Sequence, residues 1–566
     1  MPPFTRRAFV IAMGATLVSL LSGCGSSDDA DSASESGELD AADFTHGVAS
    51  GDPSHDAVML WTRAQAVTTG ATSARVRYVI ARDPDFSEIF TSGTVLGIAE
   101  RDWTIKLDLR DLTSDTAYYY RFESANGVSP VGRTRTAPIG DVAQLRLAFV
   151  TCSSYITGYF HAYRRVAERN DLHAVIHLGD YIYENGTQDK VRPHLPAREL
   201  LSLADYRERY AQYRGDEDLQ ELHRQHPVIW IWDDHEVAND AWKDGAGAHD
   251  ESAEGDYAER RFAAMQAAFE WMPIRAPDAA DPSRVWRSFR FGDLVDLYMI
   301  DARHHGRDEP LPPNSLFGDA VPVFTQSGEF ADDARQILGA SQEDWLAERL
   351  STGTSRWQLI GNQVYFAPLK LLGLPRAIDG GGLYLSNDKW DGYDPARARV
   401  IEMIRAREGG NVVILTGDAH EAYAFEVTDD PNGPGYQPLS GQGSVAVEFV
   451  STSITSRGDL ASGDGPTALF AQLSANAEQL LRLTNPHLKY YENTLNGYLL
   501  LDLTPERLQA EFWTVPFVTA RSDEQMFARA FTVESGSNRL VAASEASAAI
   551  ADAPLPAPAP LAVSSS

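Results

Sequence analysis

Residues 176–184 are Ile176-His177-Leu178-Gly179-Asp180-Tyr181-Ile182-Tyr183-Glu184, an apolar segment that passes directly into polar and aromatic side chains. The predicted strand covers 173–179, and three more predicted strands end in the same way. Strand 145–151 runs into Cys152, strand 227–232 into Asp233-Asp234-His235-Glu236, and strand 411–416 into Gly417-Asp418-Ala419-His420. Because α/β proteins bind ligands at the carboxyl ends of their strands, we expect these four endings to converge.

The pattern around these motifs indicates an α/β fold. Strands are also predicted at 295–301, 357–361 and 444–450, and helices separate many of the strands. Several strands are almost continuously apolar, as expected where both faces of a sheet are covered. We therefore predict a large domain over 142–540, built as an α/β sandwich around a mixed sheet.

The preceding segment, 43–138, has an all-β pattern. Apolar and polar residues alternate over 74–80 and 104–109, and 118–122 is an aromatic strand. This indicates an N-terminal β-sandwich of about seven strands, similar to an immunoglobulin or fibronectin module, which supports the larger domain by packing against it. The Ala-, Pro- and Ser-rich tail, 541–566, is predicted to be disordered.

The first 24 residues are typical of a targeting peptide. The pair Arg6-Arg7, with Phe9 following, resembles the twin-arginine signal, whereas an ordinary secretory signal is the alternative. The apolar run 11–21 is shorter than the roughly 20 residues that a membrane helix needs. Leu21-Ser22-Gly23-Cys24 resembles a lipoprotein box, the alternative being a cleavage site that happens to contain a cysteine.

These features predict export by the twin-arginine machinery to the periplasm or the cell surface, with a lipid on Cys24 as the membrane anchor. A flexible linker is expected over 25–42, where the chain is acidic and rich in serine. The formal net charge of −31 argues against nucleic acid or an anionic membrane surface as a specific partner. An anionic substrate must then be attracted locally, by metal ions or arginines.

The chemistry of the four strand endings indicates a metal centre. Cys152 is the only cysteine besides Cys24, and a metal would protect its thiolate, although most lone cysteines are small buried hydrophobic residues. A thiolate and the phenolate of Tyr183 suit a trivalent ion such as Fe³⁺, whereas Asp and Asn oxygens suit calcium or manganese. Asp180 can bridge two cations that activate a water, and His235 can protonate the leaving alkoxide.

The combined motifs resemble the PhoD family of alkaline phosphatases and phosphodiesterases, within the calcineurin-like metallophosphoesterases and akin to purple acid phosphatases. The resemblance spans about residues 43–540, including Phe44–Pro53 and Asn485–Tyr490. It implies a ferric ion at Cys152, Asp180, Tyr183 and His420. It further implies one or two calcium ions, or other divalent ions, at Asp234, Asn239, Asp391 and Asp418, with Asp388 nearby.

The same resemblance assigns a substrate role to Arg303. This residue, in Ile300-Asp301-Ala302-Arg303, matches a family motif and could grip the phosphate, unless it forms a surface salt bridge. The leading hypothesis is an exported enzyme that hydrolyses phosphate monoesters, and also diesters, to release inorganic phosphate. Two alternatives stay open: a phospholipase D-like enzyme whose main substrate is a diester, and a lipid-anchored binding protein without catalytic activity.

Overall fold

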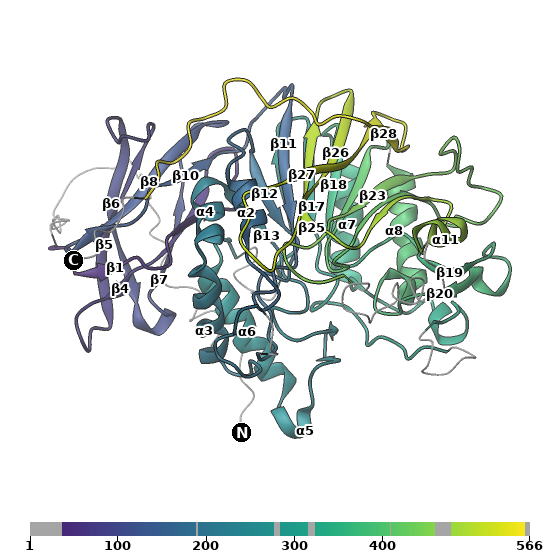
Figure 1. Ribbon diagram of the computed structural model, residues 1–566, viewed down its shortest axis with the longest axis horizontal. Helices are drawn as coiled ribbons and strands as arrows, with labels where there is room; N and C mark the ends of the chain where they lie inside the picture. Colours follow the sequence, from purple (N-terminus) through teal and green to yellow (C-terminus); the bar gives the residue numbers. More distant parts are fainter. Residues whose placement is uncertain are drawn as a thin grey trace, which may run out of the picture.

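The computed structural model describes residues 37–187, 191–276, 284–314, 323–407, 409–458 and 477–560. The predicted signal, 1–24, and most of the predicted linker lie outside these residues. The described chain is a mixed α/β structure with two large sheets, which confirms the predicted α/β class (Figure 1). Among the described residues, no helix combines the length and the apolar character needed to cross a membrane.

The larger sheet has ten strands in the order β28-β27-β26-β25-β11-β12-β13-β2-β3-β7. Its centre, β11-β12-β13-β2, is parallel, and the strands on either side are antiparallel. The strands are β2 (Val48–Gly51), β3 (Val58–Arg63), β7 (Thr104–Leu109), β11 (Leu145–Val150), β12 (Ala174–His177), β13 (Pro227–Trp230), β25 (Asn496–Leu503), β26 (Arg507–Val515), β27 (Met526–Glu534) and β28 (Val541–Ala543).

The second sheet has seven strands in the order β16-β17-β18-β21-β23-β22-β24. They are β16 (Arg287–Phe291), β17 (Val295–Met299), β18 (Trp357–Asn362), β21 (Val412–Thr416), β22 (Ala422–Val427), β23 (Ala446–Val450) and β24 (Leu488–Glu492). The two sheets share one apolar core, in which Leu147 and Phe149 of β11 join Val413 of β21 and Phe449 of β23. Burial on both faces explains the continuous apolar runs of these strands.

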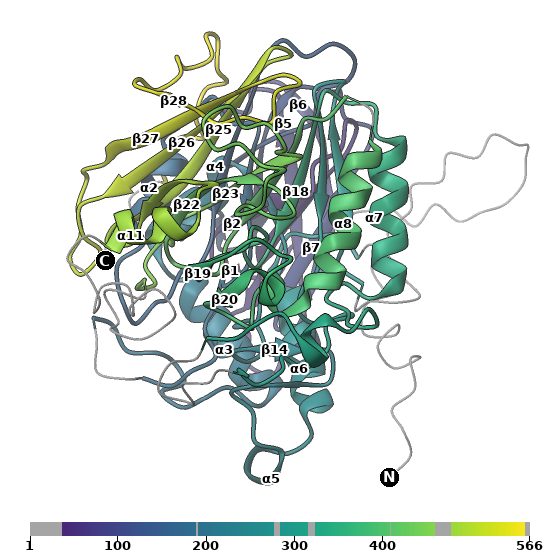
Figure 2. The same ribbon diagram turned by 90° about the vertical axis from the view of Figure 1, so that its right-hand side faces the viewer.

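Helices cover the outer faces of both sheets. Figure 2 shows α7 (Ala340–Thr352) and α8 (Asp394–Ala406) together on the seven-stranded sheet, where they bury Leu346 and Val400 against Ile360 and Ile414. The ten-stranded sheet is covered by α2 (His161–Ala167), α3 (Leu203–Arg214), α4 (Glu217–Gln225) and α6 (Tyr257–Trp271). The smaller elements are β1 (Ala42–Asp43), β4 (Gln65–Ala66), β14 (Ala241–Trp242), β15 (Gly245–Ala246), β19 (Lys370–Gly373), β20 (Gly382–Tyr384), α5 (Glu251–Glu254) and α11 (Ala477–Thr484).

The N-terminal segment is a β-sandwich that shares one of its sheets with the rest of the molecule. Its own sheet contains β5 (Ser73–Ala81), β6 (Ile89–Ile98), β8 (Ala117–Ser124), β9 (Gly127–Val128) and β10 (Gly132–Arg135). The facing layer is β2-β3-β7, which continues the ten-stranded sheet because β2 pairs with β13. The β-sandwich that the sequence predicts is therefore continuous with the larger sheet, because β2 supplies the backbone partners that β13 would otherwise lack at a sheet edge.

The C-terminal tail is ordered as far as the structure describes it. Residues 541–543 form β28, and the chain then runs across to β8 and β10 (Figure 1, yellow). The Tyr119 hydroxyl donates to Leu555 O at 2.6 Å, and the Arg224 guanidinium donates to Pro558 O at 2.9 Å. The prediction of a disordered tail is therefore wrong over 541–560, because buried side chains far away in the sequence satisfy its backbone carbonyls.

Candidate metal centre

The loops that follow β11, β12, β13 and β21 bring potential metal ligands together. The described chain contains three overlapping groups of three potential ligands. Within each group the three ligand atoms, one per residue, all lie within 4.8 Å of one another. The groups are Cys152, Asp180 and His420; Asp180, Asp234 and His235; and Asp233, Asp234 and Asp418. The predicted convergence of the four strand endings is thus present, and Asp180 and Asp234 each belong to two groups.

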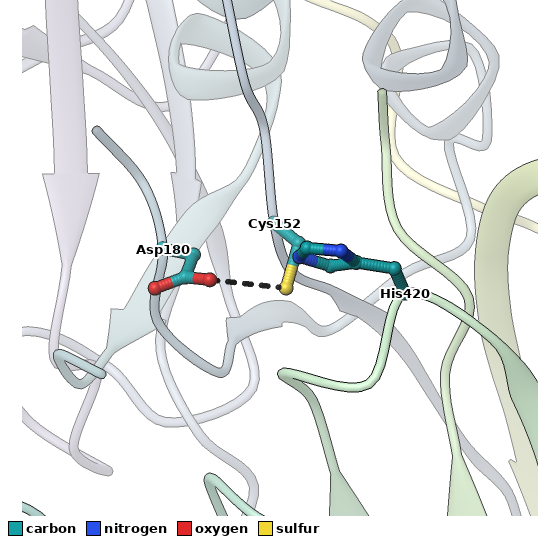
Figure 3. Close-up of side chains that lie close together, drawn as sticks. All are labelled: Cys152, Asp180 and His420. Atoms are coloured by element: carbon teal, nitrogen blue, oxygen red, sulfur yellow. Dashed lines mark hydrogen bonds between the residues drawn. The ribbon is translucent and has the colours of Figure 1, made fainter. Parts of the chain in front are cut away.

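The first group forms a compact set of sulfur, oxygen and nitrogen donors. Figure 3 shows the Asp180 carboxylate facing the Cys152 sulfur at 3.5 Å, with the His420 ring beside it. The Tyr183 hydroxyl donates to Asp180 Oδ2 at 3.1 Å and lies 3.2 Å from His420 Nε2. His420 Nδ1 lies 2.9 Å from Arg457 O, to which it donates as the protonated ring nitrogen, so that Nε2 is the lone-pair nitrogen facing the group.

The backbone at these positions is held in an uncommon conformation. Cys152, Asp180, Asp418 and His420 have φ angles of 59°, 55°, 61° and 58°, in the left-handed region that side chains disfavour. Each such residue costs roughly 1–2 kcal/mol relative to right-handed backbone. Strain of this kind persists where the surrounding structure enforces it, and it concentrates at functional sites.

Close approach of two loops accounts for the glycine in the Gly179-Asp180 motif. Gly179 has a φ of +97°, and a Cβ there would lie 2.4 Å from the backbone nitrogen of Asp233. The carboxylate of Glu236 joins the same two loops, because it accepts from the backbone amides of Asp180 at 3.1 Å, Tyr181 at 2.7 Å and Asp233 at 2.8 Å. The loops after β12 and β13 are thereby fixed against each other.

The electrostatics of the first group fit a bound cation. Burial raises the pKa of Cys152, Asp180 and Tyr183 well above their usual ranges, and the neighbouring acidic groups add to the effect. In the described chain, no lysine or arginine forms an ion pair with Asp180. Burial lowers the pKa of His420 to about 4, which keeps its imidazole neutral and able to bind metal. A cation would stabilise the ionised forms that burial otherwise disfavours.

His235 lies at the edge of this centre, with its ring anchored by an acid. Its Nδ1 is 2.6 Å from Glu184 Oε2, while Glu184 Oε1 accepts from the backbone amide of Asn239 at 2.8 Å. Burial alone would lower the pKa of His235, but the carboxylates of Glu184, Asp180 and Asp234 raise it well above its usual value. His235 is therefore held as an imidazolium, the form that can donate a proton.

Arg303 is a buried partner of the acidic groups, which differs from its interpretation as a surface salt bridge. It has no exposed surface, so it is not a surface salt bridge. Its guanidinium contacts four carboxylates, those of Asp233 at 2.6 Å, Asp234 at 3.5 Å, Asp388 at 2.9 Å and Asp418 at 2.5 Å. Each of its three nitrogens donates to a carboxylate, so the guanidinium positions the third group of acids, and its predicted contact with a phosphate stays a prediction.

The sequence predicts Asp391 as a metal ligand, with Asp388 nearby. In the structure it is Asp388 that lies at the centre, and Asp391 lies away from it. The Asp391 carboxylate pairs with Arg397 at 2.6 Å and accepts from the amide of Leu369 at 2.9 Å, away from the three groups of ligands. Asp388 instead reaches Arg303 at the centre. The side chain that enters the cluster is thus three positions earlier than the predicted one, because η5 (Trp390–Tyr393) turns Asp391 toward α8.

Comparison with known proteins identifies the family. A family model described as PhoD-like phosphatase matches residues 147–512, and one described as the PhoD-like phosphatase N-terminal domain matches residues 30–138. The chain belongs to the PhoD-like phosphatase family. It is 35% identical over 492 residues to alkaline phosphatase D of Bacillus subtilis (strain 168), which covers 84% of this chain and 78% of that protein. The solved structure of PhoD matches with a TM-score of 0.76 and 31% identity, over 89% of this chain and 92% of that chain.

Membership of the PhoD-like phosphatase family makes this protein a phosphoric ester hydrolase. The sequence interpretation as a binding protein without catalytic activity is therefore set aside. The predicted ligands Cys152, Asp180, Tyr183, Asp234, Asp418 and His420 lie together in the PhoD-like fold, with His235 beside them. Asn239 follows in the same loop and is linked to the centre through its backbone amide.

Several residues of this PhoD-like centre were missed by the sequence interpretation. Glu184 and Glu236 stand inside the quoted motifs, but neither was singled out as a site residue. Lys389 forms an ion pair with Asp418, and the Ser456 hydroxyl lies 2.6 Å from the Tyr183 hydroxyl. No local pattern marks these two, because their partners lie 29 and 273 positions away.

Proposed function

We propose that the protein is an exported phosphatase that hydrolyses phosphate monoesters, and diesters as secondary substrates, at a centre of one ferric ion and calcium. The observation that carries the proposal is the convergence of Cys152, Asp180, Tyr183 and His420 from loops distant in the sequence. Thiolate and phenolate donors favour Fe³⁺ over calcium or magnesium, which prefer purely oxygen ligands.

The residues divide between two cation positions. Cys152, Tyr183 and His420 would hold the ferric ion, and Asp234 with Asn239 would hold calcium or another divalent ion. Asp180 belongs to both neighbouring groups and would bridge them. When bound, the cations would supply an activated water and neutralise charge on the phosphoryl group.

His235 would serve as the acid that protonates the leaving alkoxide. The Glu184 carboxylate, at 2.6 Å from Nδ1, orients the ring and leaves Nε2 as the atom that gives up the proton. Because the charge of Arg303 is already balanced by carboxylates, attraction of the anionic ester would depend mainly on the bound cations. This is consistent with the formal net charge of −31, which repels anions everywhere else.

The proposal also includes the structural class of the two domains. The facing ten-stranded and seven-stranded sheets support a calcineurin-like metallophosphoesterase sandwich. The layer of β5, β6, β8 and β10 over β2-β3-β7 supports an immunoglobulin-like N-terminal module. Residues 43–138 and 142–540 remain the proposed limits of the two domains.

Metal analysis combined with kinetics tests the proposed centre. Protein exported by its natural route should contain stoichiometric iron and calcium, and it should hydrolyse p-nitrophenyl phosphate at alkaline pH. Asp180→Asn should abolish turnover, and Tyr183→Phe should remove the visible tyrosinate-to-iron absorption while the fold is retained. Near-wild-type turnover in Asp180→Asn would refute the shared-metal mechanism.

The substrate preference needs a separate measurement. The ratio of kcat/KM for p-nitrophenyl phosphate to that for bis-p-nitrophenyl phosphate should exceed one if monoesters are the main substrates. The reverse ratio would favour the diesterase alternative. Both substrates carry the same leaving group, so the comparison isolates the charge and substitution of the phosphate.

Export rests on the N-terminal sequence alone, which lies outside the described residues. Replacing Arg6 and Arg7 together by lysine should leave active enzyme in the cytoplasm, measured by cell fractionation. Cys24→Ala should release the enzyme from the membrane fraction if a lipid anchors it. Unchanged export of the double lysine variant would instead indicate an ordinary secretory signal.

A further inference from the structure

Lys389 places an ammonium group inside the acidic part of the centre. Its Nζ forms ion pairs with the carboxylates of Asp388, at 3.3 Å, and Asp418. The side chain is 13% exposed, in the short segment between β20 and η5. Asp418 is a member of the third group of potential metal ligands, so a protein cation already stands at one edge of that group.

Arg303 and Arg307 add two more positive charges to the same place. Arg303 contacts Asp418 at 2.5 Å and Asp234 at 3.5 Å, and Arg307 pairs with Asp388. The connected network contains three cationic side chains and four carboxylates, namely Arg303, Arg307, Lys389, Asp233, Asp234, Asp388 and Asp418. Its formal charge is therefore −1, so side chains already neutralise most of the negative charge around Asp418.

The first group of ligands differs in this respect. Cys152, Asp180 and Tyr183 are acidic groups, and no lysine or arginine of the described chain forms an ion pair with any of them; the nearest positive charge is the His235 imidazolium, which Glu184 already pairs. Buried charges need a partner, so this side of the centre depends more on external cations, whereas the Asp418 side has a lysine and an arginine. The Asp180 carboxylate thus has no lysine or arginine partner in the described chain, whereas the Asp418 carboxylate of the same cluster has both.

We propose that Lys389, together with Arg303, occupies the cation position of the group Asp233, Asp234 and Asp418, so that the centre takes one ferric ion and a single calcium. The ammonium replaces a second calcium. This inference rests on the metal centre of the proposed function and specifies how many divalent ions that centre takes. It also removes Asp418 from the calcium ligands that the family resemblance implied.

Metal stoichiometry tests the inference without reference to activity. Elemental analysis of the exported wild type should find one iron and one calcium per chain after dialysis against calcium. Lys389→Met keeps the length of the side chain but removes the charge, and it should bind one additional calcium per chain in equilibrium dialysis. Lys389→Arg keeps the charge and should bind none. Lys243→Met, which alters the surface ion pair with Asp308, is the matched control and should match the wild type.

Asp388→Asn in the Lys389→Met background should abolish the additional calcium, because it removes a carboxylate that the ammonium had neutralised. A wild type that holds iron and two calcium ions would overturn the inference, as would an unchanged calcium count in folded Lys389→Met. If Lys389→Met fails to fold, the wild-type count decides by itself. A wild type that binds neither iron nor calcium would instead refute the metal centre, and the inference with it.

Discussion

Replacing Glu184 by glutamine should shift the pH range in which the enzyme works. Glu184 Oε2 lies 2.6 Å from His235 Nδ1, and Oε1 accepts from the amide of Asn239 at 2.8 Å. Glutamine has one oxygen and one amide nitrogen for these two donors, so one hydrogen bond is lost and the negative charge disappears. The ring of His235 would then be held less firmly and charged less readily.

The size of the effect on His235 follows from the strength of its hydrogen bond with Glu184. A hydrogen bond to a charged group contributes about 1.5–3 kcal/mol, and one pKa unit corresponds to about 1.4 kcal/mol. Loss of Glu184 should therefore disfavour the imidazolium by about 1.5–3 kcal/mol and lower the pKa of His235. The Glu184, Asp180 and Asp234 carboxylates raise this pKa against burial, so the imidazolium is present below the raised value and disappears as pH rises through it. In Glu184→Gln it should disappear at lower pH.

The assay is the pH dependence of kcat/KM for two monoesters. The alkaline limb should move to lower pH, and the loss of kcat/KM on that limb should be larger for an alkyl phosphate than for p-nitrophenyl phosphate, since only the alkoxide needs a proton. Metal content should stay at the wild-type level. Glu259→Gln makes the same change on an exposed face of α6 and should leave the profile in place.

An unmoved alkaline limb with wild-type turnover would refute the role of His235 as the acid. An equal loss for both substrates at every pH would also contradict it, because it would indicate damaged geometry rather than a missing proton. Loss of iron or calcium in Glu184→Gln would point to a role in holding the metals. Each result is distinguishable from the others within one experiment.

Four further outcomes are expected. Arg303→Lys should lower the free energy of unfolding in urea by about 3–5 kcal/mol, since lysine cannot serve the buried carboxylates that the guanidinium contacts, and a loss below about 1 kcal/mol would contradict this. Asp391→Asn should leave iron and calcium contents unchanged, whereas loss of either metal would return Asp391 to the ligands. Burial lowers the pKa of Lys106 in the folded protein to about 7, whereas in the unfolded chain it is about 10.4. Between these two pH values the unfolded chain binds one proton more than the folded protein, so the free energy of unfolding should rise with pH across that window. Lys106→Met should flatten this rise in Tm, and an identical pH profile would refute the assignment. A chain ending at Glu545 should unfold at a lower temperature in calorimetry while kcat stays within about twofold, because the deleted segment contacts Arg133 and Arg224 far from the metal centre.

The sequence alone determined the α/β class and most of the centre. Polar residues that directly follow apolar strands can be placed without tertiary information, since parallel strands align their carboxyl ends at one edge of a sheet. Cys152, Asp180, Asp234, Asp418 and His420 were found in this way. Tyr183 was found because it shares a short motif with Asp180.

Only the tertiary structure decided which charges pair with which. Arg303 and Lys389 meet their carboxylates across separations of 115 and 29 residues, and the partners of Asp388 and Asp391, Arg303 and Arg397, are also fixed only by the folded chain. The N-terminal strands joined the catalytic sheet, and the tail became ordered, through hydrogen bonds to equally remote partners. Local residue patterns report burial and strand direction, whereas ion pairing depends on distances that exist only once the chain has folded.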